Sequence, residues 1–379
     1  MTHRHLALAQ AAAEEKDWDR VRAHAQEALA GGHNAAHEFV GTAAWMQRDF
    51  KQAVAAFEAL EQPGPHAMAA LARLYLLTGD NRNGWHLVWH GCRSGAFGPA
   101  LYDTPRWEGG EVDGKHVAVW GMGCGDDMLF ARFVPALAAR GARVTVNCRH
   151  ALLRLFTSLP GVSAVLPLEQ PAADVDLHVH LAELPALFGV TRSTAWPGQA
   201  YLRAAAPVRF DGGAFNVGIV WAADSRHMEA QERSALLSCM RPLSKVPGVR
   251  LHALQMGAPR RQLYPPPVGL EDVSDLTPGI RDFADTANLI AGLDLVISID
   301  TSVANLAGAM GARMWAAVPF IPDWRWSPEG STTPWYPSAT VFRQDAPGDW
   351  DGVFSAMVDT LTREVRPAAT RMATVDTGG

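Results

Sequence analysis

The sequence predicts an α/β protein in three parts, an all-α helical head followed by two α/β halves. Residues 1–98 are rich in Ala, Leu, Glu and Gln, and their apolar residues recur at helical spacing. From residue 115 onwards, short apolar runs alternate with amphipathic stretches, which is typical of parallel α/β sheets. This alternation breaks at residues 204–213 and then starts again, so we expect two α/β halves.

Three helix–turn–helix pairs account for the head, residues 1–98. A similar polar turn recurs at Asp17-Trp18, Asp49-Phe50 and Gly79-Asp80, at spacings of 32 and 31 residues. The spacing is close to the period of about 34 residues in tetratricopeptide repeats, whose helix pairs bury their apolar faces by stacking. Two interpretations stay open: a concave surface that binds a protein or peptide, and a helical cap that supports the next domain.

The α/β elements follow in chain order. In the first half, residues 99–208, we expect strands at 115–120, 143–148, 162–166 and 175–179, and helices at 126–140 and 151–159. In the second half, residues 209–348, we expect strands at 216–221, 249–255, 295–299, 313–318 and 339–342, and helices at 234–243, 283–293 and 302–310. A closing helix within 349–366 and a flexible polar tail at 367–379 complete the chain.

Composition excludes several classes of protein. The 379 residues are 48% hydrophobic and 19% charged, which excludes disorder as the main state. The net charge of −6 argues against nucleic acid as a partner. The four cysteines form no CxxC pair, so we expect reduced thiols. No uncharged apolar run reaches about 18 residues, and the N-terminus does not resemble a signal peptide, so we expect a cytoplasmic protein without a membrane span.

Four loops follow predicted strands, at the sheet edge where open α/β sheets bind ligands. The first contains Gly123 and Gly125, which allow close approach, and Asp126, which serves either as a helix cap or as a base that takes a proton from an attacking hydroxyl. The second, Asp300-Thr301-Ser302, brings hydroxyls and backbone N–H groups to a helix N-terminus. This arrangement suits a phosphate, and a simple cap is the alternative.

The other two loops carry cations and aromatic rings. Ser225, Arg226 and His227 follow the first strand of the second half and could meet phosphate oxygens, although an incidental surface loop is equally consistent. Asp323-Trp324-Arg325 lies in a proline-bounded loop that suits stacking on a sugar or base, or packing between the two halves. Several of the 13 tryptophans gather in this region, where they would form an aromatic wall. His178 and His180 share a strand face but have no third ligand near them in the sequence, so we expect no metal.

Segments in this order resemble one known family. TGDNRNGWHLVWH, KHVAVWGMGCGDDMLFARFVPALAARGARV, RDFADTANLIAGLDLVIS and DTSVANLAGAMGARMWAAVPFIPDWRW are similar to segments of bacterial tetratricopeptide-containing glycosyltransferases, relatives of the lipopolysaccharide heptosyltransferases of glycosyltransferase family 9. The resemblance implies a GT-B fold, with residues 99–208 on the acceptor side and residues 209–348 binding the nucleotide-sugar. It implies inverting, metal-independent sugar transfer without a cofactor to a protein or glycan acceptor, which the helical repeats could hold.

The resemblance also implies roles for individual residues. Asp126 matches the proposed general base, and Asp300, Thr301 and Ser302 match the loop that holds the donor diphosphate. Further donor-binding candidates are Ser225, Arg226, His227, Gln255, Met256 and Asn305. Asp285 is either a ribose contact or a helix cap, and the cap is the simpler interpretation.

Four departures from the family pattern fall around the expected cleft. Asn305 stands where the family commonly has His, Met256 where it has Lys, and Leu129 where it has Gln, and residues 228–230 replace an Asn-Asp segment. The loss of a cation beside a leaving phosphate weakens transition-state stabilisation. These departures predict an altered donor or acceptor, or weakened catalysis. The alternative function is therefore a catalytically degenerate protein that serves as a helical-repeat adaptor.

Overall fold

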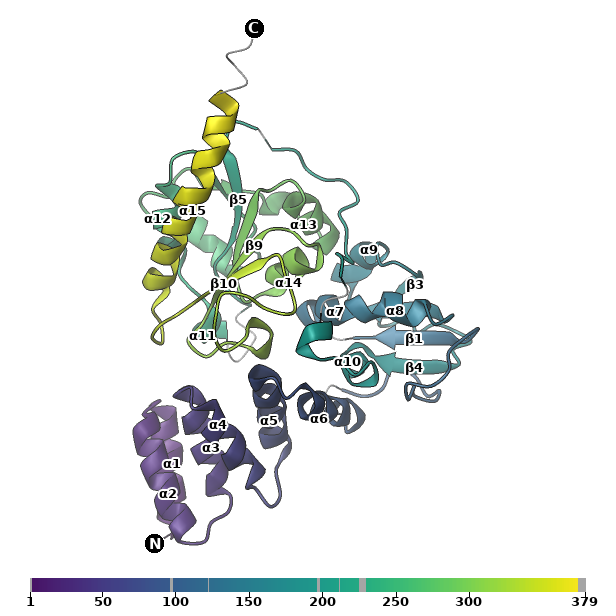
Figure 1. The fold of residues 1–379 in the computed structure, drawn as a ribbon, viewed down its shortest axis with the longest axis vertical. Coiled ribbons are helices and arrows are strands. Elements are labelled where there is room, and N and C mark those ends of the chain that lie inside the picture. The colour runs from purple at the N-terminus through teal and green to yellow at the C-terminus, as the bar shows by residue number, and fades with distance from the viewer. Residues whose placement is uncertain are drawn as a thin grey trace. The chain divides into compact units, whose positions relative to one another are not determined.

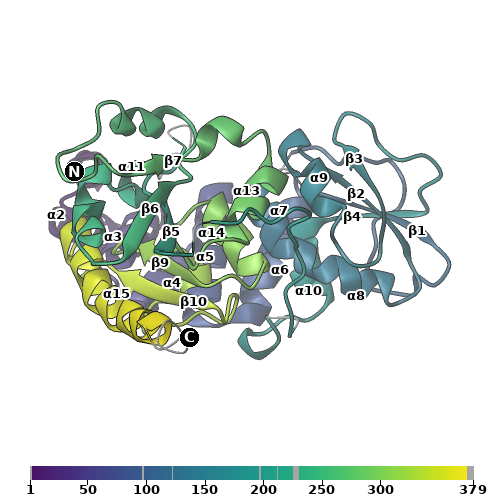
Figure 2. The same ribbon diagram turned by 90° about the horizontal axis from the view of Figure 1, so that it is seen from above.

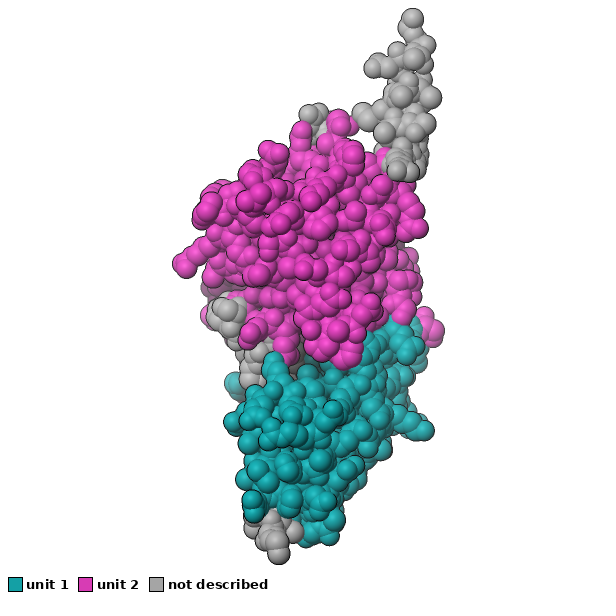
Figure 3. All heavy atoms as spheres, turned by 90° about the vertical axis from the view of Figure 1, so that its left-hand side faces the viewer, with its two compact units in different colours: residues 1–100, 185–192, 321–329 teal, residues 101–184, 193–320, 330–379 magenta. Residues whose placement is uncertain are grey.

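The computed structural model describes residues 2–95, 98–121, 123–195, 198–210, 212–224 and 230–373. The chain forms two compact units, which Figure 3 colours separately. Unit 1 consists of Met1–Ala100, Pro185–Arg192 and Ile321–Glu329, and unit 2 consists of Leu101–Leu184, Ser193–Phe320 and Gly330–Gly379. Segment 321–329, which we expected in the second α/β half, therefore groups with the helical head.

Within the described part of the head, helices pair into hairpins as the sequence predicts (Figure 1). They are α1 Thr2–Glu14, α2 Trp18–Ala30, α3 Ala36–Met46, α4 Phe50–Glu58, α5 Pro65–Thr78 and α6 Asn81–Arg93. The recurring aspartates have one local function: the side chains of Asp17, Asp49 and Asp80 each accept a backbone N–H three residues on, as N-caps of α2, α4 and α6. The membership of these hairpins in the tetratricopeptide class stays a prediction.

Side chains inside unit 1 explain why segment 321–329 joins the head. The Trp324 ring meets the edge of Trp85 on α6, with ring centroids 5.3 Å apart. Arg48 donates to the Pro328 carbonyl at 2.6 Å, and Arg73 lies 3.9 Å from the Asp323 carboxylate. These contacts involve residues far apart in the sequence, which is why strand–helix alternation alone did not reveal them.

Unit 2 contains a four-stranded parallel sheet with the order β3-β2-β1-β4. Its strands are β1 His116–Trp120, β2 Arg143–Cys148, β3 Val162–Pro167 and β4 Leu177–His180. The helices that accompany it are α7 Cys124–Phe130, α8 Val134–Ala138 and α9 Leu153–Phe156, whereas the short α10 Leu184–Leu187 falls mostly in unit 1, whose second segment begins at Pro185. The single helix expected at 126–140 is instead interrupted by a 3₁₀ turn at Ala131–Phe133, just before Pro135, which lacks a backbone N–H.

Unit 2 also contains a six-stranded parallel sheet with the order β10-β9-β8-β5-β6-β7. Its strands are β5 Phe215–Val220, β6 Val249–Ala253, β7 Ser274–Asp275, β8 Leu295–Ile299, β9 Met314–Val318 and β10 Ala339–Arg343. Its helices are α11 Ala230–Arg233, α12 Arg241–Ser244, α13 Phe283–Ile290, α14 Ser302–Ala309 and α15 Trp350–Ala373. The predicted α/β class with parallel sheets is therefore confirmed.

From residue 209 onwards, the structure departs from the expected elements at three places. The helix predicted at 234–243 is a 3₁₀ turn, Leu237–Met240, followed by the short α12, whose second residue is a proline. Strand β7 has only two residues and escaped detection by periodicity. Helix α15 continues to Ala373, although we expected the closing helix to end at residue 366 and a tail to follow; the proline at 367 removes one N–H donor without excluding helical backbone. Residues 374–379 of the expected tail lie outside the described residues.

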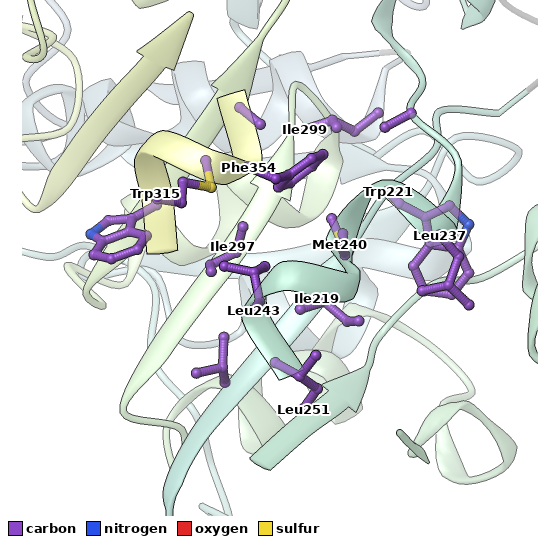
Figure 4. Packing of buried hydrophobic residues seen from close by; sticks show 14 of the residues in the cluster. Ile219, Trp221, Leu237, Met240, Leu243, Leu251, Ile297, Ile299, Trp315 and Phe354 are labelled. Atoms are coloured by element: carbon purple, nitrogen blue, oxygen red, sulfur yellow. The ribbon is translucent and has the colours of Figure 1, made fainter. Parts of the chain in front are cut away.

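A large apolar cluster fixes the second sheet (Figure 4). Ile219, Ile297 and Ile299 on the strands are fully buried, together with Leu243 of α12 and Phe354 of α15. Helices α12 and α15 cover this face, while α13 and α14 cover the other (Figures 1 and 2). Since β5 and β8 pair directly, the loops that follow their carboxyl ends are neighbours.

Candidate functional site

Two of the predicted loops meet inside unit 2. The glycine loop after β1 leads into α7, the Asp-Thr-Ser loop after β8 leads into α14, and the two helices pack together. A Cβ atom added to Gly125 would lie 3.2 Å from Asn305 Nδ2 and 3.5 Å from Ser302 Oγ. A side chain at position 125 would thus push against the first turn of α14, so glycine permits this close approach.

The paired aspartates at the start of α7 have different surroundings. Asp126 is exposed, whereas Asp127 is only 2% exposed. Asp127 donates its backbone N–H to the Gly123 carbonyl at 2.7 Å, and its Oδ1 accepts the Gly123 N–H at 3.3 Å. Asp127 Oδ2 has no hydrogen-bond partner among the described residues. The solvent-facing carboxylate of the pair therefore belongs to Asp126.

Burial raises the pKa of the Asp127 carboxyl well above its usual range, and the nearby charge of Asp126 adds to this shift. Burial likewise raises the pKa of the Cys148 thiol, to about 12. Burial thus favours the protonated forms of Asp127 and Cys148, while the neighbouring carboxylate of Asp126 is exposed. Asp127 was not among the predicted site residues; the available signal was its place on the apolar face of the helix, three residues before Phe130.

The loop after β8 presents a helix start. Thr301 precedes α14 with an extended backbone (φ −141°, ψ 174°), and its side chain makes no cap hydrogen bond. Its hydroxyl lies 2.9 Å from Ser298 Oγ instead. The first N–H groups of a helix have no partner within the helix, and with Ser302 at the first helical position this turn suits an anion. Asp300 is buried beneath the turn, with Arg233 Nη1 3.7 Å from its Oδ2.

Asn305 contacts other parts of the protein with both ends of its side-chain amide. Its Nδ2 donates to the Thr301 carbonyl at 3.2 Å, and its Oδ1 accepts the Tyr336 hydroxyl at 2.8 Å. The side chain is 3% exposed. The Asn305 amide therefore supports the turn, and a direct contact with the donor stays a prediction.

Gln255 has a comparable supporting place at the ends of β5 and β6. Its Oε1 accepts the backbone N–H groups of Trp221 and Ala222 at 3.0 and 2.8 Å, and its Nε2 donates to the Ala222 and Met256 carbonyls at 3.1 and 2.9 Å. The side chain thus joins the two strand ends. Met256 itself is 48% exposed.

Asp285 forms ion pairs that link the two α/β halves. Its Oδ2 accepts from Arg281 Nε at 3.0 Å, and its Oδ1 accepts from Arg154 Nη2 of α9 at 3.0 Å. Arg154 also donates to Asp282 at 3.1 Å. The Arg281 hydrogen bond and the Arg154 hydrogen bond lower the pKa of Asp285 well below its usual range. Asp282 is the N-cap of α13, and Asp285 Oδ2 also accepts the Arg281 backbone N–H at 3.1 Å, so Asp285 has a secondary capping contact besides its ion pairs.

The two remaining predicted loops have different outcomes. Ser225, Arg226 and His227 lie outside the described residues. Asp323, Trp324 and Arg325 lie in unit 1, where the Asp323 side chain accepts the Arg325 N–H at 3.1 Å and the Trp324 ring packs on Trp85. Packing against the head therefore replaces the expected packing between the halves. The expected aromatic wall is interior: its rings are all buried, namely Trp315, Trp324, Trp326 and Trp335.

Neither a metal centre nor a membrane-spanning helix occurs in the part of the chain that the structure describes. Over 2–95, 98–121, 123–195, 198–210, 212–224 and 230–373, no group of three or more His, Cys, Asp or Glu side chains is arranged to hold a metal ion. Over the same ranges, no helix combines the length and apolar character needed to cross a bilayer.

The protein is similar to known proteins in sequence and fold, but no family model matches it. Protein FlbA of Caulobacter vibrioides is 25% identical over 362 residues, which cover 80% of this chain and 57% of FlbA. The chain thus spans less than two thirds of that relative.

Solved structures of glycosyltransferases are also similar to the chain. A glycosyl transferase family 9 protein from Veillonella parvula is 12% identical and covers 62% of this chain and 87% of its own, with a TM-score of 0.43. The ADP-heptose lipopolysaccharide heptosyltransferase II of E. coli is 12% identical and covers 68% of this chain and 99% of its own, with a TM-score of 0.46. An O-GlcNAc transferase from Thermobaculum terrenum covers 100% of this chain and 94% of its own at 12% identity, with a TM-score of 0.31.

Proposed function

We propose that this protein is a glycosyltransferase that moves a sugar from a nucleotide-sugar donor to a protein or glycan acceptor. The observation that carries the proposal is the close approach of Gly125, beside the exposed Asp126, to Ser302 at the start of α14. A carboxylate that can take a proton and a helix start that can hold a phosphate thus belong to neighbouring turns. We assign the two α/β halves to a GT-B arrangement and the head to tetratricopeptide-like repeats that select the acceptor.

In the proposed reaction, Asp126 removes the proton of the acceptor hydroxyl as its oxygen attacks the anomeric carbon. The bond between that carbon and the donor diphosphate breaks, and the nucleoside diphosphate leaves with the electron pair. Attack from the side opposite the leaving group inverts the anomeric centre. Asp126 is suited to this role because its carboxylate reaches solvent, whereas the carboxyl of Asp127 is buried.

The leaving diphosphate needs charge stabilisation, which we assign to the α14 turn. The Thr301 and Ser302 hydroxyls and the first N–H groups of α14 supply fixed donors, and such donors stabilise developing charge without a metal ion. Ser225, Arg226 and His227 are proposed to add donors from the loop after β5. Asn305 and Gln255 support this site indirectly, through Thr301 and the strand ends.

Nucleotide binding and turnover test the proposal together. We expect calorimetric titration to detect at least one of ADP, UDP, GDP and CDP, with ADP tried first. Asp126→Asn removes the base but leaves the α14 turn intact, so sugar transfer should fall by at least about 100-fold while nucleotide affinity stays unchanged. Asp103→Asn, which alters an exposed carboxylate of the same half, serves as the matched control.

The outcomes separate the two candidate functions. Unchanged turnover in Asp126→Asn would overturn the base assignment. Absence of binding by all four nucleotides would favour the adaptor function. One observation supports that alternative: the resemblance leads us to expect a cation at position 305, but the Asn305 amide found there is hydrogen-bonded within the protein.

A further inference from the structure

A buried guanidinium lies beneath the candidate site. Arg132 is 2% exposed and sits in the 3₁₀ turn between α7 and α8. Arginine is rarely buried to this extent without hydrogen-bond partners for its five N–H donors. Its burial therefore calls for a specific set of acceptors.

The acceptors of Arg132 come from separate parts of unit 2. Nε donates to the Leu129 carbonyl at 2.7 Å, and Nη1 donates to the Ala195 and Trp335 carbonyls at 2.6 and 3.0 Å. Nη2 donates to the Tyr201 hydroxyl at 3.2 Å. One side chain thus joins α7, through Leu129, to Ala195 and Tyr201 further along the first half and to the loop that precedes β10.

Aromatic rings complete the surroundings of this guanidinium. Its carbon lies 5.3 Å from the ring centroids of Tyr201 and Trp335 and 5.1 Å from that of Tyr336. Rings at this distance attract a cation, most strongly where water is excluded. The position of the Tyr336 ring is therefore tied to Arg132.

Tyr336 connects this cluster to the candidate site. Its hydroxyl donates to Asn305 Oδ1 at 2.8 Å, and Asn305 Nδ2 donates to the Thr301 carbonyl. Its ring also packs on α14, since a Cβ atom added to Gly308 would lie 2.4 Å from Tyr336 Cδ1. A continuous set of contacts thus runs from Arg132 through Tyr336 and Asn305 to the turn that bears Thr301 and Ser302.

We propose that Arg132 and Tyr336 are positioning residues that hold the first turn of α14 against the start of α7. The importance of this positioning for catalysis rests on the proposed function. Neither side chain contacts the reacting atoms. The Tyr336 hydroxyl fixes the Asn305 amide, and Arg132 fixes the Tyr336 ring. The hydroxyl and N–H groups that would bind the diphosphate are thereby ordered before the nucleotide-sugar binds.

Tyr336→Phe isolates the hydroxyl, because the ring that packs on Gly308 and Arg132 remains. Asn305 Oδ1 then loses its hydrogen-bond donor, and because an unsatisfied buried acceptor is costly, the opening equilibrium of the turn should increase about 10-fold. Tyr102→Phe is the matched control: Tyr102 is also buried and donates to an asparagine, Asn147 Oδ1, at 2.5 Å, but that asparagine lies on β2 and not on α14.

Two measurements separate this inference from the proposed function. Exchange of the Asn305 backbone amide, which donates to the Thr301 carbonyl at 3.2 Å, needs no ligand, and we expect it to accelerate about 10-fold in Tyr336→Phe and to stay unchanged in Tyr102→Phe. The dissociation constant for the nucleotide that the wild type binds best should rise by a similar factor, also only in Tyr336→Phe. A Tyr336→Phe variant with wild-type exchange would overturn the inference, even if the nucleotide binds.

A further variant guards against a purely structural explanation. Arg132→Lys keeps the charge but lacks the planar fork, so we expect exchange of the Asn305 amide to accelerate as in Tyr336→Phe. A melting temperature that falls equally in all three variants, together with equal exchange of the Asn305 amide, would show general destabilisation and contradict the positioning role. A wild type that binds none of the four nucleotides would remove the proposed function but leave the exchange result to decide whether the turn is positioned.

Discussion

Replacing Gly121 by Ala places a methyl group inside the contact that fixes the glycine loop. The new Cβ would lie 2.0 Å from Asp127 Oδ1, 2.6 Å from Asp127 Cγ and 2.9 Å from Leu181 Cδ1. Such distances are far below van der Waals contact, so Asp127 has to move. Its hydrogen bond from the Gly123 N–H, at 3.3 Å, would then be lost.

The two effects give the expected magnitude. Overpacking of a well-packed interior costs about 1–3 kcal/mol, and loss of a buried hydrogen bond adds roughly 1 kcal/mol. We therefore expect Gly121→Ala to lower the free energy of unfolding by about 3 kcal/mol. For a domain of this size class, that corresponds to a melting temperature lower by roughly 6–12 °C.

Chemical denaturation of four variants measures this effect: Gly121→Ala, Gly110→Ala, Asp127→Ala and the double variant with both Gly121→Ala and Asp127→Ala. Gly110→Ala is the matched control, because a Cβ atom at that position would meet nothing within 4 Å. Asp127→Ala removes the clashing carboxylate, so the Gly121→Ala change should cost less than about 1 kcal/mol in that background. The pair should therefore show a coupling of about 2 kcal/mol.

Two results would refute the reasoning. Gly121→Ala could prove as stable as Gly110→Ala, which would mean that Asp127 does not pack on residue 121. Alternatively, the costs of Gly121→Ala and Asp127→Ala could be additive, which would place the strain elsewhere.

Two further predictions concern pH. Because burial raises the pKa of Asp127, the folded protein holds the carboxyl proton more tightly than the unfolded chain does, and the stability that this proton contributes below about pH 4 is lost as pH rises. In urea titrations, the stability of Asp127→Asn should therefore increase relative to that of the wild type between pH 4 and pH 7. A difference in stability that stays constant over this range would contradict the prediction. Burial opposes the shift at Asp275, but hydrogen bonds from Thr277, Tyr264 and Arg260 outweigh it and lower the pKa to about 2. Asp275→Asn should consequently lower the free energy of unfolding by about 1 kcal/mol at pH 6, and by progressively less as pH falls from about 4 towards 2, in the same titrations. An undiminished loss at pH 3 would contradict the explanation by hydrogen bonds to the ionised carboxylate.

The elements that could be predicted from the sequence are those whose burial shows in the local pattern of apolar residues. Strands such as β1 and β8 are buried along their whole length, and the amphipathic hairpins of the head repeat a capping aspartate. Both features are local, so a single sequence reveals them. The Gly125–Asp126 and Thr301–Ser302 loops were found for the same reason, since each follows a buried strand directly.

Features that depend on distant partners were missed. Arg132 looks like a surface arginine in a sequence, because its acceptors lie 63 and 203 residues away at Ala195 and Trp335. The Trp324 loop was assigned to the second half by its place in the chain, yet its ring packs on Trp85 of the head. Chain order carries no information about such pairings, and only the fold supplies it.

The two α/β halves of unit 2 are joined by contacts of different electrostatic character. Arg154 is half-exposed where it meets Asp282 and Asp285, whereas Arg132 is excluded from solvent. The Debye length falls to about 3 Å at 1 M salt, which screens exposed charges but hardly affects buried ones. Ionic strength therefore weakens the link between α9 and α13 selectively while the Arg132 cluster holds, so salt offers a reversible way to weaken one of these two connections between the halves without any mutation.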